Sequence, residues 1–271
     1  MNRIIAVNSN CYHGYSIEEA LEGIHKAGFK YVELTATKGW TEHVFPDKTF
    51  KDLCDIKNKM EELDIEAIGL SGHCNLMDIE RLDDFILNIE LAAFFSCTYI
   101  VSSIGEAHIK DKAKSSNEML VNNIEKLIPH LEKHNLTLVL ETHGEHGTGY
   151  VLNEIVKLVN SCRVKVNYDT ANVLFYSDVD MYEDIETCIE NLAYMHIKDK
   201  AGERKEWNFP ALGKGYIDFP LVLNKLDNHS NNCPLSIEIE FTASGPKDLE
   251  EVNTAVQDSS NYLISLGFSL T

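Results

Sequence analysis

The sequence alternates eight times between short apolar segments and longer amphipathic segments, and this alternation is the strongest constraint on its fold. The short segments are rich in β-branched and aromatic residues, which is typical of buried strands. They cover residues 4–7, 31–34, 66–70, 98–103, 137–141, 164–169, 194–198 and 235–240. Since a segment with 3.6-residue periodicity follows each of them, the pattern predicts eight pairs of a β-strand and an α-helix.

The amphipathic segments also carry signals for the ends of helices. The first opens with Ser16 and Glu19, which form a capping-box pattern, and closes at Gly28. The expected helices cover residues 16–28, 50–63, 79–95, 117–134, 152–161, 181–192, 219–226 and 248–266.

Eight such pairs favour a closed barrel over an open doubly wound sheet, because the count matches and no Gly-x-Gly-x-x-Gly follows the first strand. The predicted fold class is α/β, a (β/α)8 TIM barrel. Since the sequence contains no linker or second core pattern, residues 1–271 are expected to form a single domain.

The charge of the chain argues against nucleic acid as a partner. Asp and Glu number 43 against 24 Lys and Arg, a formal net charge of −19. No run of basic residues is present that would neutralise a phosphate backbone.

Cysteine usage and the N-terminal residues predict a cytoplasmic location. The seven cysteines are irregularly spaced and form no Cys-x-x-Cys, which favours reduced thiols. The first ten residues, MNRIIAVNSN, lack the apolar stretch of a signal peptide. No segment approaches the roughly 18 uninterrupted apolar residues of a membrane span, so no contact with a membrane is expected.

Four predicted strands end in polar residues, at the end of a TIM barrel where active sites lie. The fifth ends in Glu141, the sixth in Asp169 and the seventh in His196. The eighth ends in Glu238 or Glu240. Any one of these residues alone is explained by a structural role, but three buried carboxylates and an imidazole at one mouth are costly to desolvate unless a cation pairs with them. This set favours one divalent ion, Mn²⁺, Mg²⁺, Co²⁺ or Zn²⁺, with an open coordination position.

The same residues lie in an ordered set of motifs: LETHG (140–144), YDTAN (168–172), HIKD (196–199), LGKGYIDF (212–219) and SIEIE (236–240). Together they resemble the sugar phosphate isomerase/epimerase superfamily, the xylose isomerase-like TIM barrels of the AP endonuclease family 2 type. Members include ketose 3-epimerases, hydroxypyruvate isomerase, inosose isomerases and dehydratases, and AP endonucleases. The resemblance therefore implies the fold along the chain but leaves the reaction open.

Carried over position by position, the family's metal ligands fall on Glu141, Asp169, His196 and Glu238. The resemblance favours Glu238, because the family's last glutamate follows residues similar to Leu235, Ser236 and Ile237. Glu240 lies on the same strand face and remains the alternative ligand; it is also a candidate substrate contact.

One position departs from the family pattern. Three residues after the aspartate the family usually has histidine, and this chain has Asn172. In the endonucleases that histidine helps to hold a multi-metal cluster, so its replacement favours a single ion and argues against DNA repair. Asn172 is instead expected to hydrogen-bond a sugar hydroxyl.

Several further residues are candidate substrate contacts, each with an ordinary structural alternative. His73 ends the third strand, His108 lies in the loop after the fourth, and His143 follows Glu141 with the same parity. Lys198 shares the inward parity of His196, although a solvated lysine at the barrel rim is equally compatible with the sequence. The aromatic candidates of the first two βα loops, for which ordinary loop packing is the alternative, are Tyr12, His13, Trp40 and Phe45.

The long loop at residues 200–215 contains three basic residues, Arg204, Lys205 and Lys214. They are candidates for contact with a phosphate or carboxylate, or are simply solvated, because no glycine-rich phosphate loop opens a helix here. Phosphorylated and free sugars both remain open.

The leading prediction is a divalent-metal-dependent isomerase or epimerase of a small ketose, a keto acid or their phosphates, in carbohydrate metabolism. Glu141 and Glu238 would move the proton through an enediolate. The alternatives are a dehydratase of an inosose or dehydroshikimate-type substrate, a sugar-binding barrel without catalysis, and an AP endonuclease. Family relatives of this type also suggest a homo-oligomer, a dimer or tetramer.

Overall fold

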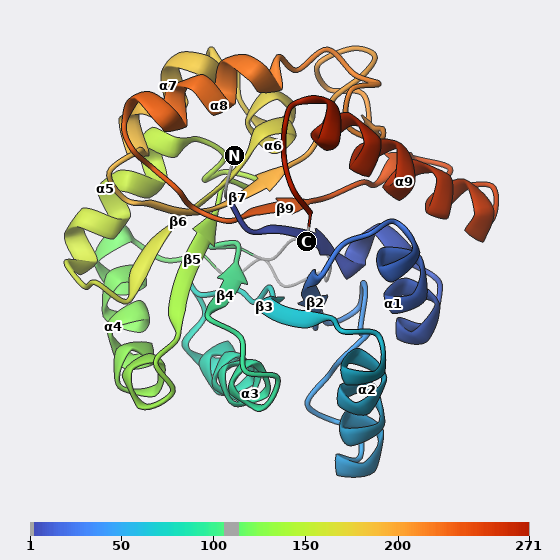
Figure 1. The fold of residues 1–271 in the computed structure, drawn as a ribbon. Helices are drawn as coiled ribbons and strands as arrows, with labels where there is room; N and C mark the ends of the chain where they lie inside the picture. The colour runs from blue at the N-terminus through green and yellow to red at the C-terminus, as the bar shows by residue number, and fades with distance from the viewer. Residues whose placement is uncertain (1–2, 106–113, 271) are drawn as a thin grey trace.

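The computed structural model describes residues 3–105 and 114–270. Eight parallel strands close into a barrel in the order β1-β2-β3-β4-β5-β6-β7-β9, with helices packed around the outside (Figure 1). The strands are β1 Ile5–Asn8, β2 Tyr31–Thr35, β3 Glu66–Ser71, β4 Tyr99–Ser102, β5 Thr137–Glu141, β6 Val164–Asp169, β7 Leu192–Ile197 and β9 Leu235–Ile237. The predicted (β/α)8 TIM barrel is confirmed.

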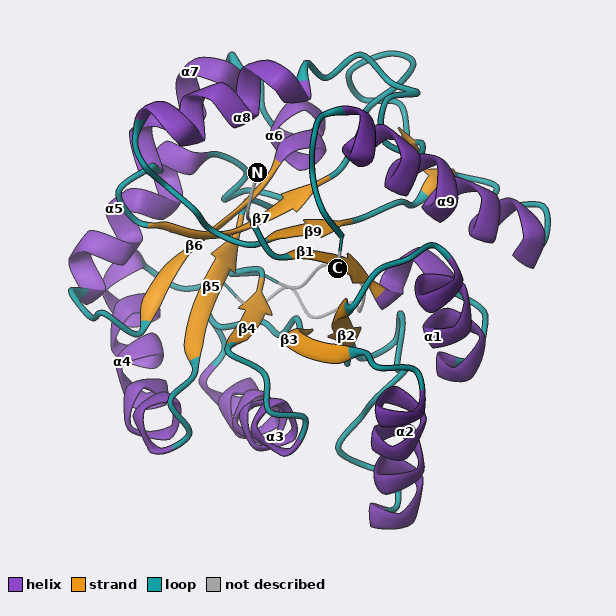
Figure 2. Cartoon of the chain, viewed as in Figure 1, coloured by secondary structure: helices purple, strands orange, loops and turns teal. Residues whose placement is uncertain are grey.

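The helices alternate with these strands and form the outer layer, drawn purple around the orange strands in Figure 2. They are α1 Ile17–Lys26, α2 Phe50–Glu62, α3 Leu82–Phe94, α4 Asn117–Lys133, α5 Gly149–Val159, α6 Thr170–Tyr176, α7 Met181–Cys188, α8 Phe219–Asn228 and α9 Leu249–Ser265. Within the described residues no helix is both long and apolar enough to cross a membrane.

Three short features did not emerge from the sequence pattern. The helix α6 has only seven residues and follows β6 directly. A 3-10 turn occupies Ser9–Tyr12, after β1. The strands β8 (Asn208–Phe209) and β10 (Phe241–Thr242) pair antiparallel as a small ribbon that joins the loops after β7 and β9. Segments this short give no readable hydrophobic period, so only the tertiary structure reveals them.

The barrel interior is apolar in one layer and becomes polar in the next layer toward the carboxyl ends of the strands. Ala6, Ile68, Val101, Val139 and Tyr194 pack together as a separate buried cluster inside the ring of strands. Because successive side chains alternate between the two faces of a strand, the next inward position toward the carboxyl end carries a polar side chain on several strands. On β7 this alternation places His196 directly above Tyr194.

The carboxylate of Asp199 fixes the loop after β7. It accepts backbone N–H groups of Lys200 at 2.8 Å, Gly213 at 2.9 Å and Gly215 at 2.8 Å. A Cβ at residue 215 would lie 2.2 Å from Asp199 Oδ1, so this backbone approach requires glycine. The HIKD and LGKG motifs therefore form one structural unit.

Replacing Asp199 with alanine is expected to lower the free energy of unfolding by about 3 kcal/mol, because it removes the acceptor of the buried N–H groups of Lys200 and Ile217 and of two partly buried ones. Chemical denaturation measures the loss. Asp178→Ala, at a side chain that is 86% exposed, is the control. A loss under about 1 kcal/mol in Asp199→Ala would show that the loop is held by other contacts.

Candidate metal centre

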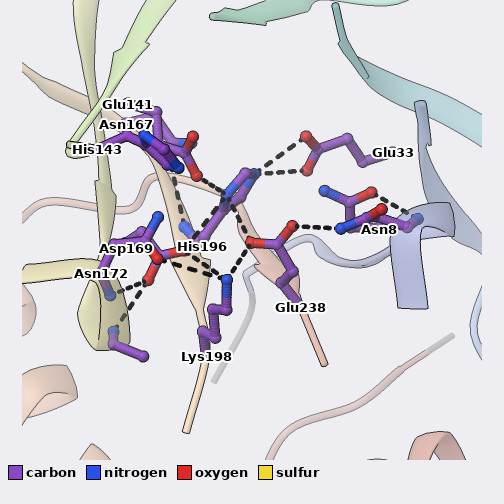
Figure 3. A network of polar contacts seen from close by, with 12 residues as sticks. Asn8, Glu33, Glu141, His143, Asn167, Asp169, Asn172, His196, Lys198 and Glu238 are labelled. Carbon is purple, nitrogen blue, oxygen red and sulfur yellow. Dashed lines mark hydrogen bonds and ion pairs between the residues drawn. The ribbon is translucent and has the colours of Figure 1, made fainter. Parts of the chain in front are cut away.

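Four side chains from four strand ends meet inside the mouth of the barrel. Glu141 ends β5, Asp169 ends β6, His196 lies in β7 and Glu238 follows β9. One ligand atom of each lies within 4.8 Å of those of the others, and all four residues are buried. Figure 3 shows them converging around the imidazole of His196.

The Nδ1 atom of His196 is the centre of this group. It lies 2.8 Å from Glu141 Oε1, 3.4 Å from Glu238 Oε2 and 3.9 Å from Asp169 Oδ2. Three buried carboxylates thus face one ring nitrogen.

The opposite side of the His196 ring contacts Glu33, which is not among the residues predicted from the sequence. Both carboxylate oxygens of Glu33 lie 3.0 Å from Nε2, and the hydroxyl of Tyr194 donates to Glu33 Oε2 at 3.1 Å. The Glu33 side chain is fully buried in β2. When the ring is neutral, an Nε2–H bonded to this carboxylate leaves the Nδ1 lone pair directed at the cluster. The sequence signal that could have identified Glu33 is an acidic residue at an inward-facing position of β2, which has the sequence YVELT.

Asp169 divides its two oxygens between the backbone and the cluster. Its Oδ1 accepts the N–H groups of Ala171 at 2.9 Å and Asn172 at 2.8 Å, which caps the start of α6. Its Oδ2 is buried and has no hydrogen-bond partner. Buried carboxylate oxygens are rarely left without a partner, so this atom fits a role as a cation ligand.

The electrostatics of the group also fit a cation. Burial raises the pKa of Glu141 and raises that of Asp169 well above its usual range. Burial alone would also raise the pKa of Glu238, but the charges of Lys198 and His196 outweigh it and hold that pKa well below the usual value. A divalent ion would stabilise all three carboxylates in their ionised form. Three oxygen donors and one imidazole are a donor set that such ions accept.

Lys198 is buried in an ion-pair network beside the cluster, with 2% of its surface exposed, and is not a solvated lysine at the rim. Its Nζ lies 2.5 Å from Glu240 Oε2 and 3.4 Å from both Glu238 Oε2 and Asn172 Oδ1. Glu240 thus pairs with Lys198, whereas Glu238 belongs to the group of four. Asn172, at the position where the family has histidine, points into the same network (Figure 3).

A cavity of about 120 Å³ opens beside Glu141 and Glu238. Six of the predicted substrate contacts line it: Trp40, His73, His143, Asn172, Lys198 and Glu240. His73 Nδ1 accepts the N–H of Ser103 at 2.9 Å, so Nε2 carries the proton and faces Glu141 Oε2 at 3.5 Å.

Other predicted residues lie elsewhere. Tyr12 does not reach the cavity, because the 3-10 turn after β1 directs it into the core, where its hydroxyl donates to Asn253 Oδ1 at 3.1 Å. Phe45 lines a different cavity. Arg204 donates to the carbonyl of Ser177 at 2.8 Å, and Lys214 lies 3.1 Å from Asp258. His108 lies outside the described residues.

Comparison with known proteins identifies the family. The family model described as the xylose isomerase-like TIM barrel matches residues 21–265. The chain therefore belongs to the xylose isomerase-like TIM barrel family, as its motifs predicted. No curated protein matches the chain.

Solved structures of the same fold include sugar epimerases. D-psicose 3-epimerase, solved in the presence of D-fructose, is 14% identical with a TM-score of 0.77, covering 96% of this chain and 97% of that one. The IOLI protein with a bound zinc atom is 18% identical with a TM-score of 0.75, covering 98% and 99%. The 3-keto-D-glucoside 4-epimerase YcjR from E. coli is 15% identical with a TM-score of 0.73, covering 97% and 100%. At these identities the likeness is one of fold.

Proposed function

We propose that this protein is a divalent-metal-dependent isomerase or epimerase acting on a small sugar or keto acid. The observation that carries the proposal is the buried group of three carboxylates and one imidazole that borders a cavity at the catalytic end of the barrel. The sugar epimerases among the structures of the same fold, and the zinc atom bound in one of the others, support it.

The residues that would hold the ion are Glu141, Asp169, His196 and Glu238. When bound, a divalent ion supplies Lewis-acid stabilisation of the negative charge that develops on substrate oxygens. The absence of thiolate among these residues favours an ion with oxygen and nitrogen ligands, and manganese is the ion we would test first.

Glu141 and Glu238 are the proposed acid and base. Each has one oxygen in the cluster and another that meets a donor at the cavity: Glu141 Oε2 lies near His73, and Glu238 Oε1 accepts from Asn10 Nδ2 at 3.1 Å. Since β6 and β7 separate β5 from β9 around the barrel, the two glutamates approach a bound sugar from different sides. One can remove the proton next to the carbonyl while the other returns a proton elsewhere or on the opposite face.

Chromatographic separation of substrate and product, followed by mass spectrometry, tests the reaction class. Ketoses and keto acids would be incubated with the metal-restored protein. An isomer of unchanged mass is the expected product, whereas a product lighter by one water would instead identify a dehydratase. A chain that converts none of these substrates and binds no divalent ion would contradict the proposal.

The Glu33 carboxylate is expected to act as a positioning residue through His196. Replacing it with glutamine should weaken metal binding by roughly 10- to 100-fold, because the hydrogen bond that orients the imidazole and sets its tautomer is weakened. Competition with a chelator measures the affinity directly. Glu66→Gln, at the exposed first residue of β3, is the matched control. Wild-type affinity in Glu33→Gln would contradict this role.

A further inference from the structure

The two tryptophans of the chain stand at the border of two cavities. Trp40 and Trp207 line the inner cavity beside the candidate metal ligands, and both also line a second, outer cavity. Asn10 and Glu240 likewise border both, so the two spaces adjoin. The inner cavity measures about 120 Å³, below the roughly 300–1,000 Å³ of ordinary ligand pockets, whereas the outer one measures about 430 Å³. A ligand that fills both is larger than a single small sugar.

Part of the wall of the outer cavity comes from the ribbon of β8 and β10, which is separate from the eight-stranded barrel, and from the residues next to it. Trp207 directly precedes β8, and residues 242–246 continue from β10 along the wall of the cavity. Phe241, in the middle of this wall, has a φ of 57°, a conformation that a bulky residue keeps only where its surroundings enforce it. The ribbon therefore presents Trp207 and the 242–246 segment in a defined arrangement.

Both indole rings are held by neighbouring side chains. His13 stacks on Trp40 with ring centroids 4.1 Å apart, and the Trp40 Nε1–H donates to Asn10 Oδ1 at 2.9 Å. Trp207 packs edge-on against Phe209 with centroids 5.1 Å apart. Fixed aromatic rings beside the hydroxyls of Thr242 and Ser244 match the chemistry of a sugar ring, whose C–H face packs on an aromatic ring while its rim hydrogen-bonds.

The charges at the two cavities do not suit a phosphate. Over residues 3–105 and 114–270, Lys198 is the only Lys or Arg at either cavity, and it is paired with Glu238 and Glu240. Glu240 borders both spaces and would repel an anion. The loop cations Arg204 and Lys214 are engaged by other parts of the chain.

We propose that the outer cavity is a second sugar subsite, so that the substrate is an unphosphorylated glycoside: a reacting sugar in the inner cavity carrying a second ring between Trp40 and Trp207. This proposal rests on the proposed function for the identity of the inner site. It adds a substrate class that the metal centre does not specify.

Three ligands that differ only at one hydroxyl test the proposal: D-fructose, D-fructose 6-phosphate and isomaltulose, which carries a glucosyl group on the same oxygen. Calorimetry on the full chain with metal restored should show isomaltulose binding about tenfold tighter than fructose, equivalent to about 1.4 kcal/mol. Fructose 6-phosphate should bind no tighter than fructose. Because both tryptophans line the outer cavity, isomaltulose should also change the tryptophan emission more than fructose does.

Substitutions in and away from the outer cavity test whether the tighter binding of isomaltulose arises there. Ser244→Arg fills the outer cavity from an exposed position, and Trp207→Ala removes one ring; in both, the ratio of fructose to isomaltulose dissociation constants should fall toward one. Asn232→Arg, in the exposed loop before β9 at the opposite end of the barrel, should keep the ratio. The proposal is overturned by equal affinities, by tighter binding of the phosphate, by a ratio that survives both substitutions, or by the absence of binding.

Turnover separates this proposal from the function it rests on. If fructose exchanges a proton with solvent but isomaltulose binds no better, the second subsite fails and the isomerase remains. If isomaltulose binds tightly at the tryptophans but no sugar is converted, the subsite stands and the proposed reaction fails.

Discussion

Removal of the divalent ion is expected to abolish turnover and to lower the melting temperature by roughly 8 °C or more. An ion present at 1,000 times its dissociation constant stabilises the folded state by about 4 kcal/mol. In a chain of this size, each kcal/mol shifts the melting temperature by about 2–4 °C. The reason is local: without the ion, Glu141 and Asp169 are buried carboxylates whose ionised forms lack a sufficient counter-charge. Calorimetry with a chelator and after metal is restored measures the shift.

The control for this experiment is a variant that lacks one ligand. Asp169→Asn keeps the shape of the side chain and removes its charge, so the metal-dependent part of the shift should largely disappear. Equal melting temperatures with and without the ion in the wild-type protein would show that the four residues do not bind it in the folded state.

Replacement of either proposed acid–base residue is the second large effect. Glu141→Gln and Glu238→Gln should each lower kcat by roughly 10²- to 10⁴-fold, because an amide occupies the same space but cannot accept and return a proton. The rate of product formation is measured at saturating metal, so that loss of the ion is not mistaken for loss of the base. Glu154→Gln, an exposed change on α5, should leave kcat unchanged. A loss under about tenfold in both active-site variants would contradict the assignment.

The sequence predicted the barrel because each of its eight units carries a local signal. Strand segments buried between the interior and the helices are continuous apolar runs, and the helices carry caps and a 3.6-residue period. The same logic located Glu141, Asp169 and His196 and narrowed the fourth residue to Glu238 or Glu240, since the carboxyl ends of barrel strands face one mouth.

Contacts across the barrel were harder to predict. Glu33 and His196 are 163 residues apart, and strand parity shows that both point inward but not that they touch. Lys198 was equally compatible with a solvated position, because its burial depends on Glu238 and Glu240 together. In the sequence, only the family resemblance distinguished those two glutamates, and it favoured Glu238. In the structure, β9 ends at Ile237, and the backbone N–H of Glu240 donates to the carbonyl of Phe209 in the ribbon.

The residues around the mouth were predicted least well. Tyr12 and Trp40 both lie in early βα loops, yet the 3-10 turn buries Tyr12 in the core while Trp40 lines both cavities. Trp207 did not appear among the candidates, because its position depends on a ribbon of two-residue strands. Loop conformation arises from tertiary pairing, which the local pattern does not encode.

The proton transfer assigned to Glu141 and Glu238 can be followed through exchange of the substrate's carbon-bound proton with deuterated water. Ketoses and keto acids are incubated with the metal-restored protein and followed by NMR. Deuterium should enter at one carbon next to the carbonyl in the wild-type protein, and Glu141→Gln and Glu238→Gln should abolish its entry. Exchange retained in both variants, or no exchange with any of these substrates, would contradict this assignment.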